Sequence, residues 1–324
     1  MDRRPDLYSF CPVSTLPRPL KTGACIAVIA PSGSPENENH VEPAIQALRD
    51  YGFRVQVGKS VHAERVGYLA ATDEVRAADV NAAFADPDVD AILCLKGGYG
   101  TPRILDMLDY ARIRDNPKLF IGYSDITALH LAIARHAGFP TMHGFMALNL
   151  VGDRDERSLQ RWFETITAEG ALGVLPIDEP HALTTLSPGA TEGRLTGGNL
   201  SLVSALVGTS YALDPRGAIL FLEDVGEEPY RVDRMLNQLR LADYFEQCAG
   251  VVLGTWKGCT PEEPERSMSL YQVFSDYFAR IGKPVLAGVP AGHGYPALTI
   301  PLGVAARLDA NQGMLEILES AVGT

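Results

Sequence analysis

A serine stands where a predicted strand ends and a predicted helix begins. The segment Phe120–Thr127 reads F-I-G-Y-S-D-I-T, with Ser124 on the bend. A tight turn of this kind exposes the serine hydroxyl above the sheet edge and directs the N–H of Asp125 into the same space. An oxyanion formed there would meet backbone donors at a helix N-terminus. Ser124 is therefore a candidate nucleophile, although Ile126 replaces the second glycine of the usual G-x-S-x-G turn and a serine here is also an ordinary N-cap.

A serine nucleophile needs a base, and the chain has seven histidines. His130 and His136 fall on the helix after the serine, where their side chains are expected to point away from its start. His143 follows a short strand-like segment and is the second candidate. His293 is the first candidate, because it stands in the loop G-V-P-A-G-H-G-Y-P directly after a predicted strand. Its flanking glycines leave the imidazole free to project, and the two prolines restrict the loop.

The third member of such a site would be a carboxylate that orients the histidine. Glu223 and Asp224 come directly after the apolar run A-I-L-F-L. Neighbouring residues on a strand point to opposite sides, so only one of the two can do this, and the spacing leaves the choice open. On the next predicted helix, Arg231 and Arg234 lie off the apolar face, where they are either solvated or hold a substrate carboxylate.

The serine, the acid and the histidine share one position in the expected fold. Each follows the C-terminal end of a predicted strand, and open α/β sheets bind ligands at that edge. The order serine, acid, histidine along the chain is also that of the α/β-hydrolases, although triads occur in other orders on other folds.

The elements that must position these residues alternate between strand and helix. In the first half, apolar runs separated by helical periodicity predict a parallel sheet covered on both faces. The predicted strands are 24–30, 53–57, 89–95 and 118–123, and the predicted helices lie near 41–51, 73–85, 102–110 and 125–136.

The periodicity lapses between 168 and 193, where prolines and glycines are frequent. We therefore predict an N-terminal α/β domain at 1–167, a linker at 168–190 and a C-terminal α/β domain at 191–324. In the second domain the predicted helices are 199–207, 229–242 and 269–281, the predicted strands are 218–222 and 251–254, and a strand-like tail follows from 285.

The composition excludes several classes of protein. The chain has 324 residues, of which 46% are hydrophobic and 21% charged, so it can form a sizeable core. Its 28 basic and 40 acidic residues give a net charge of −12, which disfavours a nucleic-acid partner. The longest stretches without charge, 136–152 and 195–213, are broken by glycines and polar residues, so we expect no membrane span.

Five cysteines, an odd number with no C-x-x-C pair, predict neither a disulfide framework nor a structural zinc site. They are Cys11, Cys25, Cys94, Cys248 and Cys259. The first 21 residues have early charges with no apolar run behind them, so we expect no signal peptide and a cytoplasmic location.

The glycine-rich turn after the third predicted strand is not a nucleotide fingerprint. In Gly98-Tyr99-Gly100-Thr101-Pro102-Arg103 the arginine occupies the third glycine position, and Lys96 precedes the glycines instead of following them. The chain also lacks H-E-x-x-H. We therefore expect no cofactor and no metal.

Four segments in this order resemble the LD-carboxypeptidases, a family of serine peptidases. They are KGGYGTPRILDMLD, IGYSDITALH, FLEDVGEEPYRVDRMLNQL and GVPAGHGYPALTIPLG, and the resemblance extends from about Gly23 to the C-terminus. It implies an N-terminal doubly wound, mostly parallel sheet and a C-terminal swivelling-type α/β domain, with a Ser-Glu-His triad where the two meet. The matching residues are Ser124, Glu223 and His293, so the resemblance selects Glu223 over its neighbour.

The same resemblance implies further site residues. The N–H groups of Gly97 or Gly98 would join that of Asp125 as the oxyanion hole. Lys96 stands where the family commonly has arginine, which keeps the charge and loses the planar fork. We further expect the substrate site to include Tyr99, Asn199 and Arg231.

The implied activity is hydrolysis of the L,D-peptide bond that releases terminal D-alanine from murein tetrapeptides, by a homodimer. The alternative within the family is the microcin-immunity type, which cleaves an amide in a peptidyl-nucleotide. Such an enzyme would need an aromatic platform for the base, expected from the region 150–193. Trp162 is the one tryptophan there, and its helical pattern favours the core. A rival from another class is a two-domain binding protein without chemistry.

Overall fold

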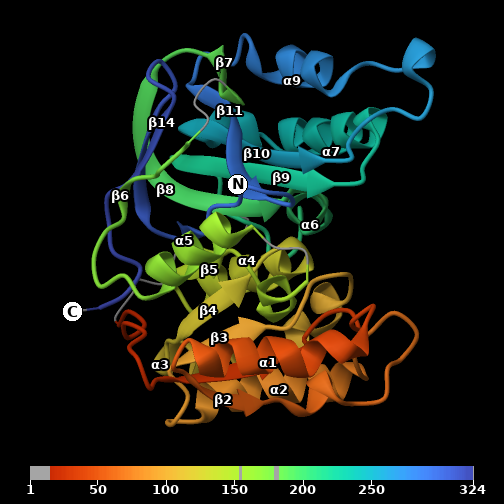
Figure 1. Cartoon of the computed structure of the whole chain (residues 1–324). Coiled ribbons are helices and arrows are strands. Elements are labelled where there is room, and N and C mark those ends of the chain that lie inside the picture. The colour runs from red at the N-terminus through yellow and green to blue at the C-terminus, as the bar shows by residue number, and fades with distance from the viewer. Residues whose placement is uncertain (1–14, 153–154, 179–181, 324) are drawn as a thin grey trace, which may run out of the picture.

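The computed structural model describes residues 15–152, 155–178 and 182–323, and these form two α/β units, one above the other in Figure 1. The first half of the chain builds the lower unit and most of the second half builds the upper one. Each unit has its own sheet, of six and of eight strands. The α/β class and the mostly parallel first sheet are confirmed.

Strands β1 to β5 of the first sheet run parallel to one another, and the sixth strand, β12, is antiparallel to its neighbour β5. Its spatial order is β12-β5-β4-β3-β1-β2. The strands are β1 Cys25–Ile29, β2 Arg54–Val57, β3 Ala91–Cys94, β4 Leu119–Gly122, β5 Thr141–His143 and the antiparallel β12 Ile300–Leu302. The α-helices of this half are α1 Val41–Asp50, α2 Asp73–Ala85, α3 Tyr110–Asp115, α4 Thr127–His136 and α5 Glu156–Ile166.

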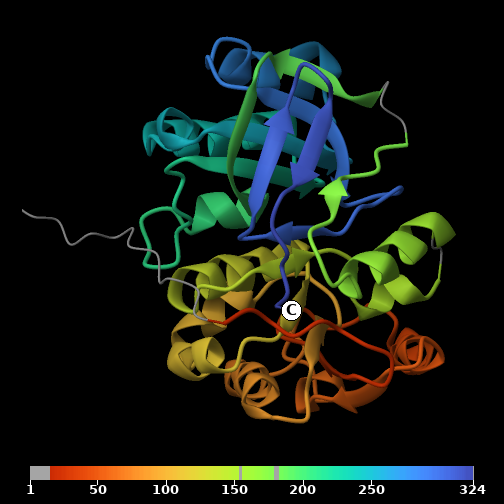
Figure 2. The ribbon, with the colours of Figure 1, turned by 90° about the vertical axis from the view of Figure 1, so that its left-hand side faces the viewer.

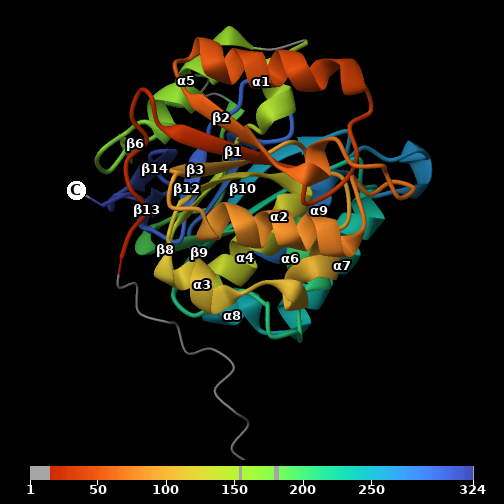
Figure 3. The same cartoon turned by 90° about the horizontal axis from the view of Figure 1, so that it is seen from below.

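Helices cover both faces of this sheet. Seen from below, α1 lies on one side of the strands and α2 and α3 on the other (Figure 3). On β1, Ile26 and Val28 face the cluster that holds α1, whereas Ala27 and Ile29 face the cluster that holds α2 to α4. A strand buried on both faces must be apolar at every position, which explains the uninterrupted apolar run.

The second sheet is mixed. Its order is β6-β14-β13-β8-β9-β10-β11-β7, with β8 to β11 parallel and the outer strands antiparallel. The strands are β6 Gly173–Val174, β7 Thr184–Ser187, β8 Ala190–Asn199, β9 Ala218–Val225, β10 Gly250–Lys257, β11 Val285–Gly292, β13 Ala305–Asp309 and β14 Met314–Ile317. The helices are α6 Leu200–Ala205, α7 Pro229–Leu241, α8 Tyr244–Gln247 and α9 Leu270–Phe278.

Two segments differ from the sequence prediction in their local structure. The stretch 168–190, expected as an irregular connection, contains β6 and β7, which add to opposite edges of the second sheet. Strands of two and four residues are too short to show alternation, so periodicity could not find them. The helix expected at 102–110 is a 3₁₀ helix at Thr101–Met107, and α3 begins anew behind Asp109, whose carboxylate caps the N–H of Arg112 at 3.0 Å.

The two predicted strands that carry the acid and the histidine are longer than expected, and this decides where the site lies. β9 runs to Val225, so Glu223 and Asp224 are still within the strand. β11 runs to Gly292, although the sequence analysis placed its last residues in a loop. His293 therefore follows directly after a strand.

The C-terminal part of the chain connects the two units. β12 leaves the second half and pairs with β5, with Ile300 opposite His143. Figure 2 shows the final segment descending from the upper unit to the lower one. There the N–H of Gly323 donates to the carbonyl of Pro17 at 2.9 Å. The two units are therefore joined by backbone hydrogen bonds as well as by side chains.

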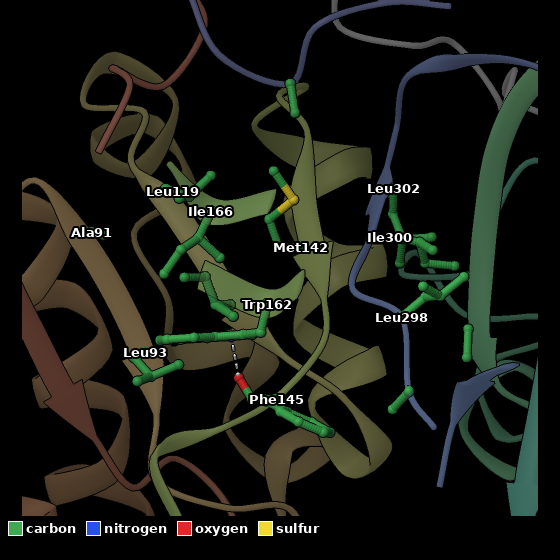
Figure 4. Packing of buried hydrophobic residues seen from close by; sticks show 14 of the residues in the cluster. Ala91, Leu93, Leu119, Met142, Phe145, Trp162, Ile166, Leu298, Ile300 and Leu302 are labelled. Atoms are coloured by element: carbon green, nitrogen blue, oxygen red, sulfur yellow. Dashed lines mark hydrogen bonds between the residues drawn. The ribbon is translucent and has the colours of Figure 1, made fainter. Parts of the chain in front are cut away.

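Trp162 on α5 belongs to the core, as its helical pattern predicted. Its side chain is fully buried, and its indole N–H donates to the carbonyl of Phe145 at 3.1 Å. Figure 4 shows it beside Leu93 and Ile166 in the same cluster. A buried indole whose donor is already used cannot serve as an exposed platform for a base.

The remaining expectations on composition concern cysteines, metals and membranes. Cys25, Cys94, Cys248 and Cys259 are free thiols and buried, and Cys11 lies outside the described residues. Within the described residues, no three His, Cys, Asp or Glu side chains are grouped so that they could hold a metal ion. In that same part of the chain, no helix has the length and apolar character needed to cross a bilayer.

Gly197 on β8 is a position where a side chain has no room. Its φ is +133°, and an added Cβ would overlap the carbonyl oxygen of Phe221 on the paired strand β9. We predict that Gly197→Ala lowers the free energy of unfolding by about 3 kcal/mol or more, as measured by urea titration. Gly208→Ala is the matched control: its φ is +88° and no atom lies within 4 Å of the added Cβ, so it should cost about 1 kcal/mol. Equal losses in the two variants would contradict this prediction.

We expect His130 on α4 to make the stability depend on pH. The side chain is buried, and its Nε2 lies 2.8 Å from the carbonyl oxygen of Gly122 at the end of β4, to which the neutral ring donates. Burial lowers the pKa of His130 to about 4, against about 6.5 in the unfolded chain. Between these values the unfolded chain binds more protons, so stability is full above pH 6.5 and is lost as the pH falls towards 4.

We predict that this one group removes about 3 kcal/mol of stability at pH 4 relative to pH 7, since each pKa unit is worth about 1.4 kcal/mol. The measurement is urea unfolding at several pH values for the native chain and for His130→Gln, which cannot titrate. The variant should show a shallower decline between pH 6.5 and 4. An identical pH slope in both proteins would show that His130 is not responsible.

Candidate active site

Ser124 is held in a strained turn between β4 and α4. It begins a 3₁₀ helix, Ser124–Ile126, and its φ of +65° is one of two positive values for residues other than glycine in the described chain. Such a conformation costs about 1–3 kcal/mol, so the surrounding structure must impose it. At Gly122 an added Cβ would lie 2.9 Å from Cγ2 of Ile126. The glycine two positions before the serine thus makes room for the isoleucine that replaces the second glycine of the turn.

The His293 ring lies between Ser124 and Glu223. Its Nε2 is 3.1 Å from the Ser124 Oγ, and its Nδ1 is 2.7 Å from the Glu223 Oε2. The backbone N–H of His293 donates to the same carboxylate oxygen at 3.2 Å. The three residues follow or end β4, β9 and β11, and therefore come from two different sheets. The sequence predicted this meeting at strand C-termini.

His143, the second candidate base, does not reach Ser124. It is buried, and neither ring nitrogen has a hydrogen-bond partner among the described residues. Burial holds the pKa of His143 well below its usual value, so the ring is neutral. The centre of its ring lies 4.9 Å from that of Phe221, which it meets edge-on, and 5.9 Å from that of Tyr123. This histidine is therefore a core residue beside the site.

The strand alternation separates the roles of Glu223 and Asp224. Glu223 is fully buried and faces His293, whereas Asp224 accepts from the side-chain amide of Asn199 at 2.8 Å and from the Ser201 hydroxyl at 2.9 Å. Burial raises the pKa of Glu223, and the hydrogen bonds from His293 oppose that shift. Gly292 must lack a side chain, because an added Cβ would lie 2.5 Å from the Glu223 Oε2.

The glycine-rich loop after β3 lies against the serine. An added Cβ on Gly97 would be 2.9 Å from the Ser124 Cβ and 3.1 Å from its Oγ, so only glycine allows this approach. The same point is 3.5 Å from the backbone nitrogen of Asp125. Gly98 has φ +123° and packs closely on Gly33. The backbone of this loop therefore lies close to the serine hydroxyl and to the backbone nitrogen of Asp125.

The side chain of Asp125 ties this loop to the serine turn, a role that the sequence analysis missed. Its Oδ2 accepts from the Thr101 N–H at 2.8 Å and from the Ser32 hydroxyl at 2.6 Å, and its carbonyl accepts from the Thr101 hydroxyl at 2.5 Å. All three residues are buried. Thr101 follows β3 and Asp125 follows β4, and the two meet because these strands are parallel neighbours in the sheet. Since 24 positions separate them along the chain, no local pattern indicates this pairing.

Arg76 on α2 was also missed, because an arginine on a polar-looking helix is normally solvated. Its side chain is fully buried and donates to the carbonyls of Pro31, Gly100 at 3.0 Å and Ala71 at 3.3 Å. It also forms an ion pair with Asp73. One guanidinium therefore fixes three loops, including the end of the glycine-rich loop.

A cavity of about 460 Å³ opens over the serine and the histidine. Tyr123 forms part of its wall: its ring lies 5.0 Å from that of His293, its hydroxyl accepts from Asn149 at 3.3 Å, and burial raises its pKa to about 12. Sequence reasoning did not select Tyr123 or Asn149. The full lining is Glu36, Asn37, His40, Lys96, Gly97, Gly98, Tyr123, Ser124, Met146, Leu148, Asn149 and His293.

Three predicted substrate residues are not part of this lining. Asn199 is buried and caps α6, and its amide donates to Asp224. Arg231 is exposed and pairs with Glu227 at 3.7 Å. Tyr99 is exposed on the rim of the glycine-rich loop, and its ring lies 5.6 Å from that of a neighbouring tyrosine. Their part in substrate binding stays a prediction.

Comparisons with known proteins agree on the family. The sequence model of the family's LD-carboxypeptidase N-terminal domain matches residues 26–144. The sequence model of its LD-carboxypeptidase C-terminal domain matches residues 192–308. A protein of Bacillus subtilis named probable murein peptide carboxypeptidase is 40% identical over 294 residues, which cover 90% of this chain and 91% of that protein.

Solved structures share the fold over nearly the whole chain. A muramoyltetrapeptide carboxypeptidase from Oxalobacter formigenes is 31% identical with a TM-score of 0.80, covering 93% of this chain and 100% of that one. The microcin C7 self-immunity protein MccF, solved with aspartyl sulfamoyl adenosine, is 25% identical with a TM-score of 0.87, covering 95% and 99%. Both domains are matched in order and a curated relative is 40% identical, so this chain belongs to the LD-carboxypeptidase family.

Proposed function

We propose that the chain is a serine LD-carboxypeptidase that hydrolyses the L,D-peptide bond of murein tetrapeptides and releases the terminal D-alanine. The observation that carries the proposal is the hydrogen-bonded series from Glu223 through His293 to Ser124 at the floor of the cavity. Its support from relatives is the name of the Bacillus subtilis protein and the activity named for the Oxalobacter structure.

Acylation begins at Ser124. The His293 Nε2, 3.1 Å away, takes the hydroxyl proton as the Oγ attacks the carbonyl of the residue that precedes D-alanine. The imidazolium that forms keeps its Nδ1–H on the Glu223 carboxylate, 2.7 Å away, which fixes the tautomer and stabilises the positive charge. Glu223 acts in its ionised form, for which its buried surroundings provide two N–H donors on one oxygen.

The tetrahedral oxyanion is held by backbone donors. We assign the N–H of Asp125 and that of Gly97 or Gly98 to this role, because the glycine loop lies against the serine turn. Each such donor contributes about a hundredfold to a thousandfold to turnover. His293 then protonates the amine of the leaving D-alanine, and a water activated by the same ring clears the acyl-enzyme.

The microcin-immunity activity is the second candidate, since MccF superposes with the higher TM-score. A nucleotide substrate needs an aromatic surface for its base, and Trp162, the one tryptophan in the expected region, is buried in the core. The 40% identity to the Bacillus subtilis protein named probable murein peptide carboxypeptidase, against 25% to MccF, also favours murein peptides. A cytoplasmic location and a homodimeric state, the first expected from the sequence and the second from its resemblance, remain predictions.

The first test is hydrolysis of a murein tetrapeptide, followed by mass spectrometry. We predict the loss of one alanine with the native chain and a fall in turnover of at least about a thousandfold with Ser124→Ala. Fluorophosphonate labelling should occur in the native chain and vanish in the variant, which should fold normally. Ser275→Ala is the control, because that hydroxyl donates to the Tyr271 carbonyl within α9.

Three outcomes would contradict the proposal. Unchanged hydrolysis by Ser124→Ala would eliminate the serine mechanism. Cleavage of an aminoacyl-nucleotide without release of alanine from the tetrapeptide would establish the second candidate. Reversible ligand binding without labelling of any serine would favour a binding protein.

The second test compares the two neighbouring acids. Glu223→Gln keeps the size of the side chain and removes the charge that stabilises the imidazolium, so kcat should fall by about 10²- to 10⁴-fold with little loss of stability. Asp224→Asn replaces one acceptor oxygen by an N–H₂ donor, which then faces the donors of Asn199 or Ser201. The lost hydrogen bond should lower the free energy of unfolding of this variant by about 1–3 kcal/mol. Its kcat should fall far less. If Asp224→Asn is the slower enzyme, the assignment of the acid is wrong.

A further inference from the structure

A carboxypeptidase must recognise the free carboxylate at the end of its substrate. That carboxylate lies close to the bond that is cut, because only a nitrogen and an α-carbon separate the two carbonyl carbons, about 3 to 3.7 Å apart. A group that binds it must therefore reach the immediate surroundings of Ser124. It should also be a cation, because charge-assisted hydrogen bonds to a carboxylate are the strong ones.

Among the described residues that line the cavity, Lys96 alone carries a permanent positive charge. It directly precedes Gly97, whose backbone lies against the serine. A lysine side chain extends about 6 Å from its Cα, so the ammonium can cover the distance from the glycine loop to the carboxylate. Lys96 is thus next in sequence to the glycine that lies against the serine, and its side chain lines the same cavity.

The surroundings of Lys96 leave its ammonium available to a ligand. Its side chain is 20% exposed, and its Nζ lies 3.4 Å from the Oε1 of Glu36, which is 96% exposed. An ion pair with a carboxylate in open water contributes little, about 0–1 kcal/mol. A substrate carboxylate inside the cavity, where water is partly excluded, competes favourably with it.

We propose that Lys96 binds the terminal carboxylate of the substrate and so makes the enzyme an exopeptidase. This inference rests on the proposed function and adds to it a specificity-determining residue. Glu36 would then hold the ammonium at the cavity wall until the substrate arrives. The other carboxylates of a murein peptide lie further along the chain from the cleaved bond, on the opposite side of it.

The test compares two substrates that differ only at the terminal group. One is the tetrapeptide L-Ala-γ-D-Glu-L-Lys-D-Ala, and the other is the same peptide ending in D-alaninamide. The native enzyme should prefer the free acid by about 10- to 100-fold in kcat/KM. Lys96→Met, which is similar in size and uncharged, should lower kcat/KM for the acid by the same factor and leave that for the amide unchanged. Lys96→Arg, which keeps the positive charge, should retain most of the preference for the free acid over the amide.

Two controls separate recognition from a structural effect. Fluorophosphonate, which has no carboxylate, should label Ser124 in Lys96→Met at the native rate. Lys21→Met should change neither substrate, because Lys21 lies outside the cavity lining and pairs with Glu169 at the same distance of 3.4 Å.

The outcomes distinguish this inference from the proposed function. An equal loss of activity on both substrates, or a loss of labelling, in Lys96→Met would mean that the lysine supports the glycine loop and would overturn the inference alone. An unchanged preference in that variant would do the same. Failure of the native chain to release alanine or alaninamide from either peptide would overturn the proposed function and this inference with it.

Discussion

The hydrogen bond between the His293 ring and the Ser124 hydroxyl joins two separate sheets. Ser124 stands on the first sheet, and the histidine and its carboxylate partner stand on the second. Its length of 3.1 Å is set by how the two units pack. Their contact is built next to the serine, where the N–H of Asn199 donates to the Thr127 hydroxyl at 3.0 Å and β12 pairs with β5.

Glycines make these close approaches possible, each against a named neighbour. Gly97 lets one loop lie on Ser124, Gly292 lets the histidine strand lie on Glu223, and Gly198 lets β8 reach Thr127. In each case an added Cβ would overlap an atom of the site or of its support. The catalytic geometry therefore depends on missing side chains as much as on the three that carry the chemistry.

Buried charge holds the backbone around the serine. The Asp125 carboxylate and the Arg76 guanidinium lie within the first unit, and both are almost fully buried. Their partners are mainly backbone N–H and C=O groups of the loops at the strand ends. Loops fixed in this way lose little freedom when a transition state forms, which is the condition for efficient oxyanion stabilisation. The strained φ of Ser124 is a consequence of the same support.

The sequence by itself determined the α/β class, most strands and helices, and the serine and histidine that now lie in hydrogen-bond contact, with two neighbouring candidates for the acid. Apolar runs and helical spacing are local, and turn chemistry marks where strands end, so Ser124, His293 and the pair of acids could be found at sheet edges. The choice of Glu223 over Asp224 came from a family resemblance and not from spacing. The short strands β6 and β7 and the crossing of β12 carried no periodic signal.

Only the tertiary structure decided how residues distant in sequence share one space. It showed that Asp125 binds Thr101, that Arg76 is buried, that Asn199 is an internal cap, and that Tyr123 and Asn149 form the wall of the cavity. These facts depend on which sheet neighbour each loop meets and on how the two units pack. A hydrogen bond across the fold leaves no mark on the local sequence, because each partner alone has the composition of an ordinary helix or turn.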